Sequence, residues 1–170
     1  MSRTRRVQRA VLAAVTVGLA LAAHAQPRNL APQARITASS EYSKAHQARF
    51  VADGRIAELG GRNDEGNAWA VQGRTHGNAA ELTFEWPQPV VAAQVVYYSR
   101  SAHAVEGWKD YELYADDQAR PVATGQFKSG HGPQAIDLPA PLRLRKLRLR
   151  FTSSFGGINP GASEVQVWSA

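Results

Sequence analysis

The stretch ELTFEW (residues 81–86) indicates the fold class, because apolar and polar side chains alternate through it. In an extended chain Leu82, Phe84 and Trp86 point to one face, and the residues between them point to the other. This period of two is typical of a β-strand with one buried face. The apolar run Val90–Tyr98 follows directly, and its many Val and Tyr residues predict a central strand.

Further strand-like runs lie on both sides of this stretch, and clusters of Pro, Gly and Asn separate them. These runs are Arg35–Ser39, Tyr111–Tyr114, Pro121–Phe127, Gln134–Leu138, Leu147–Phe151 and Val165–Val167. The apolar residues change parity near Arg145 and Lys146, which predicts a bend or bulge there. No long window carries a helical stripe. The sequence therefore predicts an all-β single domain of about eight strands, a sandwich or jelly roll, with Trp69 and Trp86 in its core.

The first 25 residues have the features of a cleavable signal peptide. Four arginines precede a run of 14 apolar or small residues, 10–23, and the small–x–small site Ala23-His24-Ala25 follows. The run is shorter than the roughly 20 residues of a membrane-spanning helix, although an uncleaved anchor is the alternative. We expect export to the periplasm or the medium, a mature domain of residues 26–170, and no stable membrane insertion after cleavage.

Composition narrows the function classes further. The chain carries 20 basic and 14 acidic residues, but four basic residues belong to the leader, so the mature charge is about +2. A nucleic-acid-binding domain keeps its basic excess in the folded part, so no nucleic-acid partner is expected. We interpret the basic residues of 143–150 as a solvated strand face, with a polyanion surface as the alternative. Because the chain has no cysteine, its stability must come from a core or a metal ion.

The sequence shows no pattern of catalytic residues. It lacks a Gly-x-Ser-x-Gly elbow, a cysteine nucleophile and a His-Glu-x-x-His zinc motif. The mature histidines at 46, 76, 103 and 131 stand singly in separate loops. Glu81 and Glu85 would lie about 13 Å apart along a strand, farther than a glycosidase pair at about 5–9 Å. We therefore expect a protein that is not an enzyme.

Several blocks together resemble the discoidin family, also called coagulation factor 5/8 type C domains, and the related family 32 carbohydrate-binding modules. The matching blocks are Asn29–Ala31, Ile36–Ser40, Ala48–Gly54, Trp69, Leu82–Phe84, Pro89-Val90 and Asn159–Val167. They cover about residues 29–168, nearly the whole mature chain. The resemblance implies a galactose-binding-like jelly roll with its two termini close together.

The resemblance also implies a structural calcium ion, which many members hold. The Asp of the Asp-Gly pair and a Glu in the last strand supply side-chain oxygens in the family, and these match Asp53 and Glu164. Calcium takes about 6 to 8 oxygen ligands. The polar loop of residues 54–67 adds three candidates, Asn63, Asp64 and Asn67. The alternative is that Asp53 only caps a turn with Gly54.

The family binds ligands at loops on one end of the sandwich. A sugar site needs an aromatic face and fixed polar groups, and the loop residues that offer them are Tyr42, His46, Arg100, Trp108, Phe155 and Asn159. Trp108 is the sharpest candidate, because an exposed Trp is costly without a use; packing under its loop is the alternative. We expect a non-catalytic carbohydrate-binding module-like protein whose partner is a glycan or polysaccharide. The alternative is an adhesion or structural module that binds a protein, a lipid head group or another envelope polymer.

Overall fold

The computed structural model describes residues 26–56, 58, 60–61, 63–73, 79–100 and 102–170. The expected signal peptide, residues 1–25, lies outside the described residues, as does His76. Within the described part, no helix has the length and apolar character needed to cross a membrane.

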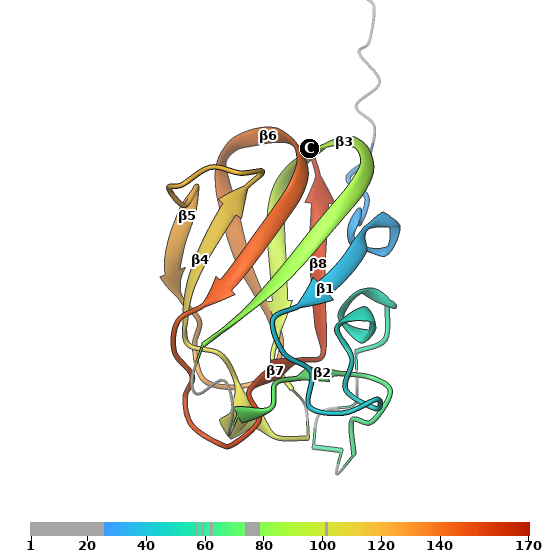
Figure 1. The fold of residues 1–170 in the computed structure, drawn as a ribbon, viewed down its shortest axis with the longest axis vertical. Coiled ribbons are helices and arrows are strands. Elements are labelled where there is room, and N and C mark those ends of the chain that lie inside the picture. The colour runs from blue at the N-terminus through green and yellow to red at the C-terminus, as the bar shows by residue number, and fades with distance from the viewer. Residues whose placement is uncertain (1–25, 57, 59, 62, 74–78, 101) are drawn as a thin grey trace, which may run out of the picture.

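Two long strands organise the domain into a β-sandwich (Figure 1). β3 (Ala80–Tyr98) and β6 (Pro133–Phe151) pair antiparallel along their whole length. Both strands bend over at one end, so the first half of β3 and the second half of β6 lie in one layer and their other halves lie in the second layer (Figure 1). The predicted all-β sandwich is confirmed.

The remaining elements complete these layers. In the first layer β1 (Arg35–Ala38) pairs with β3, while β4 (Asp110–Ala115) pairs with β6 and with β5 (Ala123–Gln126). In the second layer β8 (Glu164–Ser169) pairs with β3. A two-stranded sheet of β2 (Trp69–Ala70) and β7 (Gly161–Ala162) lies at the lower end (Figure 1). The described helices are the short 3-10 turns η1 (Ala31–Gln33), η2 (Ala48–Ala52) and η3 (Ala104–Glu106).

The proline clusters at 87–89 and 139–141 lie within the long strands, so their interpretation as turns between separate strands is wrong. Proline has no N–H to give to a strand ladder, and the β3–β6 pairing skips both clusters and resumes beyond them. The prolines therefore interrupt the pairing at the bend where each long strand turns over from one layer into the other (Figure 1). The predicted irregularity near Arg145 and Lys146 is confirmed, because two outward residues separate the buried Leu144 and Leu147.

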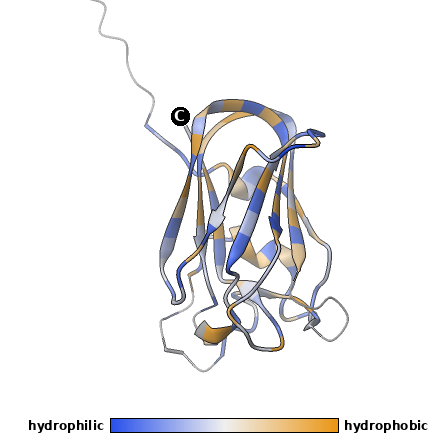
Figure 2. Ribbon diagram, turned by 90° about the vertical axis from the view of Figure 1, so that its left-hand side faces the viewer, coloured by the Kyte–Doolittle hydropathy of each residue, from blue (hydrophilic) through white to orange (hydrophobic). Residues whose placement is uncertain are grey.

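The core fills the space between the two layers, as the alternation of apolar and polar residues along the strands indicates (Figure 2). Leu82, Phe84 and Trp86 all face inward, as predicted. Trp69 is also buried, and its indole N–H donates to the Ser40 carbonyl at 2.8 Å. The inward-facing residues read from the sequence therefore form the core.

The basic residues of β6 form part of a charge-paired strand face. Arg148 lies 3.5 Å from Glu81 on β3, and Arg150 lies 3.5 Å from Glu112 on β4. The guanidinium of Arg148 also stacks over Tyr114 at 4.7 Å. These contacts favour the interpretation as a solvated face, although this half of β6 is an interior strand and not an edge.

The two ends of the folded chain lie side by side at the end of the sandwich opposite β2 and β7 (Figure 1). The Leu30 N–H donates to the Val167 carbonyl at 2.6 Å, and the Ser169 N–H donates to the Arg28 carbonyl at 3.0 Å. The close termini implied by the resemblance are therefore observed. The lower end of the sandwich carries the small β2–β7 sheet and the loops around it.

Candidate functional site

Several loops meet at the lower end of the sandwich, around the small β2–β7 sheet (Figure 1). The Tyr42 N–H donates to the Ala70 carbonyl at 2.7 Å, which joins the first loop to β2. The Phe155 N–H donates to the Gly107 carbonyl at 3.0 Å, which joins the last loop to the one that follows β3. Residues far apart in sequence are thus gathered in one place.

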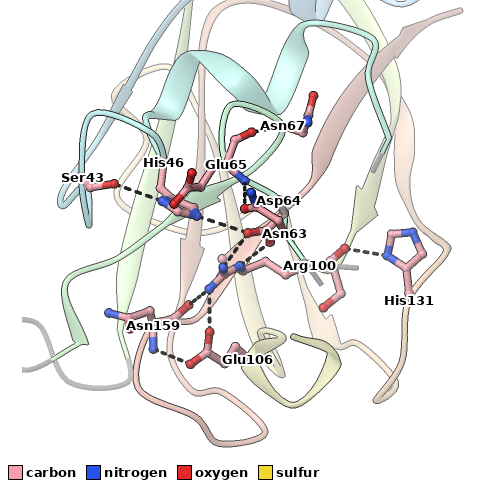
Figure 3. Close-up of polar contacts among 12 residues, drawn as sticks. Ser43, His46, Asn63, Asp64, Glu65, Asn67, Arg100, Glu106, His131 and Asn159 are labelled. Atoms are coloured by element: carbon pink, nitrogen blue, oxygen red, sulfur yellow. Dashed lines mark hydrogen bonds and ion pairs between the residues drawn. The ribbon is translucent and has the colours of Figure 1, made fainter. Parts of the chain in front are cut away.

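Arg100, just after β3, holds these loops together from inside (Figure 3). Its Nε and Nη2 donate to the two carboxylate oxygens of Asp64, each at 2.8 Å. Its Nη1 donates to Glu106 Oε2 at 2.5 Å and to the Asn159 carbonyl at 2.9 Å. All three guanidinium nitrogens are engaged and the residue is buried, so Arg100 organises the loops and offers no free face to a ligand.

His46 belongs to the same buried network (Figure 3). Its Nδ1 lies 3.0 Å from Ser43 Oγ, and its Nε2 lies 3.2 Å from Asp64 Oδ1. Burial raises the pKa of Asp64, but the hydrogen bonds and charges of Arg100 and His46 together outweigh burial and lower it. Asp64 therefore stays ionised at neutral pH although it is only 1% exposed.

Trp108, the strongest candidate for a sugar-stacking residue in the sequence, is a core residue. It is 0% exposed, and its ring stacks on Phe151 with centroids 4.8 Å apart and on Trp69 at 6.0 Å. The ligand-contact prediction for Trp108 is therefore wrong, and the alternative of packing under its loop is correct. A loop position alone does not reveal which way a side chain turns.

Phe155 and Tyr42 are the predicted residues that offer aromatic surface. Phe155 is 37% exposed and Tyr42 is 46% exposed. Asn159 is half-buried, and its Nδ2 donates to the Val71 carbonyl at 2.8 Å. This amide therefore joins the last loop to the segment after β2.

Sequence reasoning missed three residues of this end of the molecule. Val105 and Ile158 are exposed apolar side chains on neighbouring loops, and Glu106 accepts the hydrogen bonds that hold those loops together. The signal for the first two was an apolar residue inside a Gly-rich or polar loop. Glu106 carried no sequence signal, because its partners lie six and more than fifty positions away.

The candidate calcium ligand Glu164 is a buried carboxylate without hydrogen-bond partners among the described residues. It is 0% exposed, and both of its oxygens lack a partner. Burial raises the pKa of Glu164 to about 8, and the nearby charge of Asp53 adds to this. The Gly54 N–H faces the carboxylate and acts in the opposite direction, without forming a full hydrogen bond. A cation would satisfy both charges, so Asp53 and Glu164 fit the implied ion.

The other three candidate metal ligands make contacts elsewhere. Asp64 is bound to Arg100 and His46, which is incompatible with its predicted role as a calcium ligand. Asn63 Oδ1 accepts the Glu65 N–H at 3.0 Å, and Asn67 Nδ2 donates to the Glu65 carbonyl at 3.4 Å (Figure 3). These local bonds shape the turn that presents Asp64 to Arg100. Any further calcium ligands would therefore have to include backbone carbonyls.

One cleft lies away from these loops, in the first layer near the strand bend. Its volume is about 760 Å³, and Arg35, Glu85 and Lys146 are among the residues that line it. Arg35 pairs with Glu85 across the strands, and Lys146 pairs with Asp117. The other two charged side chains of the lining, Asp116 and Arg145, bond to backbone groups. Each charged side chain of this cleft therefore already has a partner.

A family model described as a domain of unknown function, DUF7402, matches residues 29–168, which is most of the chain. The chain belongs to the DUF7402 family. Comparison of this DUF7402 chain with curated proteins gave no match.

Solved structures show the fold that this DUF7402 domain shares. The family 32 carbohydrate-binding module of NanJ from Clostridium perfringens, in complex with galactose, has a TM-score of 0.70 and 14% identity over 85% of this chain and 100% of the module. A second module from the same organism, CpGH89CBM32-5 with GalNAc-β-1,3-galactose, has a TM-score of 0.70 and 18% identity over 84% of this chain and 100% of its own. Chitosan-binding module 1 of a chitosanase/glucanase from Paenibacillus sp. IK-5 has a TM-score of 0.60 and 16% identity over 82% and 98%.

These likenesses confirm the predicted galactose-binding-like jelly roll of the discoidin type. At such low identities they show the fold alone. Which ligand this chain binds has to be argued from its own residues.

Proposed function

We propose that this DUF7402 domain is an exported, non-catalytic module that recognises glycans through the loops at the lower end of its sandwich. The observation that carries the proposal is that two exposed aromatic rings, Phe155 and Tyr42, lie on loops that a buried ionic network holds together. The fold shared with carbohydrate-binding modules supports it. The signal-peptide features of residues 1–25 support export.

The physical basis is the two-sided character of a sugar ring. One face of a pyranose is apolar and packs on an aromatic ring, while its hydroxyl groups need fixed polar partners. Phe155 offers the ring. Because the N–H groups of Ile158 and Asn159 are already bonded to Glu106, the polar partners of the sugar would be other groups of the loops beside Phe155. A network that fixes the loops before binding lowers the entropic cost of binding. Arg100 and Asp64 therefore act as supports beneath the contact surface.

Replacing Phe155 with alanine is expected to weaken glycan binding about tenfold or more, because stacking between an aromatic ring and its partner contributes about 0.5–1.5 kcal/mol beyond the area that it buries. A glycan array on residues 26–170 would identify a ligand, and calorimetry would give the change in Kd. Val91→Ala is the matched control, since Val91 is also an exposed apolar residue but lies near the chain termini. Equal losses in both variants would contradict a site at Phe155.

The alternative is a module that binds a protein partner. The exposed aliphatic residues Val105 and Ile158 favour it, since they enlarge the apolar surface beyond what a single sugar ring covers. A blank glycan array with a well-folded protein would favour this alternative over glycan binding.

We also propose that Asp53 and Glu164 hold a structural calcium ion, with backbone carbonyls completing the site. The support is the buried, unpartnered Glu164 carboxylate beside a second acidic group. A hard cation takes oxygen ligands of this kind. The ion would tie η2, which Asp53 terminates, to β8, which Glu164 begins.

Calcium is expected to raise the melting temperature by several degrees, since a ligand at about 100 times its Kd adds about 2.7 kcal/mol to stability. The measurement is thermal unfolding in excess calcium and in chelator. Glu164→Gln should remove the calcium response and raise the stability of the calcium-free protein, because it removes a carboxyl group that must take up a proton or bury its charge on folding. Glu112→Gln, on the solvated face of β4, should keep the full response. An identical calcium response in Glu164→Gln would place the ion elsewhere.

A further inference from the structure

Glu106 joins two loops and the buried Arg100 through a single carboxylate. It ends η3, and its Oε2 accepts from Arg100 Nη1 at 2.5 Å. Its Oε1 accepts two backbone N–H groups of the last loop, that of Asn159 at 3.0 Å (Figure 3) and that of Ile158 at 2.9 Å. Both oxygens are therefore used, one toward the network and one toward the loop that carries Phe155.

This last loop has little regular structure of its own. Gly156 and Gly157 have positive φ angles of 137° and 78°, and residues 155–160 belong to no strand or helix. Each residue in such a segment gains about 1–2 kcal/mol of conformational entropy when it is released. The loop therefore needs partners outside itself to keep one conformation, and Glu106 accepts two of its N–H groups in succession.

The Glu106 side chain also lies directly against the loop backbone. A Cβ atom at position 157 would overlap Cγ of Glu106, so only glycine leaves room for this carboxylate. A Cβ at position 156 would come no closer than 4.0 Å to its nearest neighbour, the Val105 carbonyl. Position 157 is thus fitted to Glu106, whereas position 156 is open.

We propose that Glu106 is the positioning residue of the ligand-contact loop 155–159, holding Phe155 in its binding orientation. The proposal rests on glycan binding at these loops. Charge-assisted hydrogen bonds to successive N–H groups are strong and directional, and Arg100 fixes the carboxylate in turn. Glu106 acts through the loop and is not itself a ligand contact.

Replacing Glu106 with alanine is expected to accelerate amide hydrogen exchange of Ile158 and Asn159 at least tenfold, because both N–H groups lose their acceptor. Glycan Kd is expected to rise about tenfold, the equivalent of one lost hydrogen bond of about 1.4 kcal/mol. Glu106→Gln should give intermediate values, since its amide oxygen still accepts from the loop while its NH₂ group faces the Arg100 guanidinium. Glu112→Gln, whose carboxylate pairs with Arg150 on the strand face, is the matched control.

Gly157→Ala tests the same contact from the loop side without removing the carboxylate. It should displace Glu106 and reproduce the faster exchange and the weaker binding. Gly60→Ala is the matched control, because its φ of 79° gives a similar backbone strain while an added Cβ meets nothing within 4 Å and the residue lies outside loop 155–159, so its binding should stay within about twofold of wild type. Melting temperatures within a few degrees of wild type would show that each variant is folded.

Faster exchange at Ile158 and Asn159 together with weaker binding in Glu106→Ala and Gly157→Ala would support the proposal. Unchanged exchange would overturn it, as would faster exchange with an unchanged Kd. A wild-type protein that binds no glycan would overturn the proposed function, and with it the positioning of a glycan contact. In that case the exchange data would still decide separately whether Glu106 holds the loop.

Discussion

Replacing Arg100 with methionine is expected to lower the free energy of unfolding by about 3–5 kcal/mol, the cost of removing one partner from a buried ion pair. The guanidinium binds both oxygens of Asp64, which is almost fully buried, and also contacts Glu106. Without Arg100, the buried Asp64 carboxylate would keep only His46 as a side-chain partner among the described residues. Chemical denaturation, followed by tryptophan fluorescence, measures the change.

Arg150→Met is the matched control for this prediction. Arg150 also pairs with a glutamate, but its side chain is half exposed, and surface pairs contribute about 0–1 kcal/mol. The double variant Arg100→Met with Asp64→Asn should recover part of the loss, since one unpaired charge is removed. A loss below 1 kcal/mol in Arg100→Met would show that water reaches Asp64, in contradiction to its burial.

Most strands could be predicted from the sequence because an alternating or a continuous apolar pattern marks them, whereas the two-residue strands β2 and β7 are too short to show one. Leu82, Phe84 and Trp86 face the core as their spacing indicates. The continuity of β3 and β6 through their prolines could not be predicted, because a proline cluster marks a lost ladder hydrogen bond both in a turn and in a strand bend. Only the pairing on the far side of each cluster distinguishes the two cases.

The sequence predicts which loop residues lie at this end of the molecule, but it does not predict the role of each residue. Arg100 and His46 were expected to contact a ligand, and the structure places both in a buried network. Their partner Asp64 was expected to bind calcium. A sequence shows which polar residues lie near strand ends, but charge pairing across 36 positions depends on how the loops cross in space. Glu106 could not be predicted for the same reason, because its partners in the last loop lie more than fifty positions away in the sequence.

Replacing Trp108 with alanine is expected to cost about 3–5 kcal/mol of folding stability, the usual range for a large buried aromatic residue. Its ring packs against both Trp69 and Phe151, so the variant would open a cavity beneath the loop end. Trp108→Phe should cost less, because it keeps an aromatic ring and removes an indole N–H that has no partner among the described residues. Thermal and chemical unfolding of both variants measure these losses.

Phe155→Ala, compared with Trp108→Ala, tests which of the two residues supports folding and which contacts the ligand. Because Phe155 is partly exposed, its removal should change stability by less than about 1 kcal/mol while weakening binding. Trp108→Ala should show the reverse: lower stability, with binding retained below its lowered melting temperature. A Trp108→Ala protein with wild-type stability and no glycan binding would instead place Trp108 at the ligand surface. A loss of folding stability thus assigns Trp108 to the core, and a loss of glycan binding assigns Phe155 to the ligand surface.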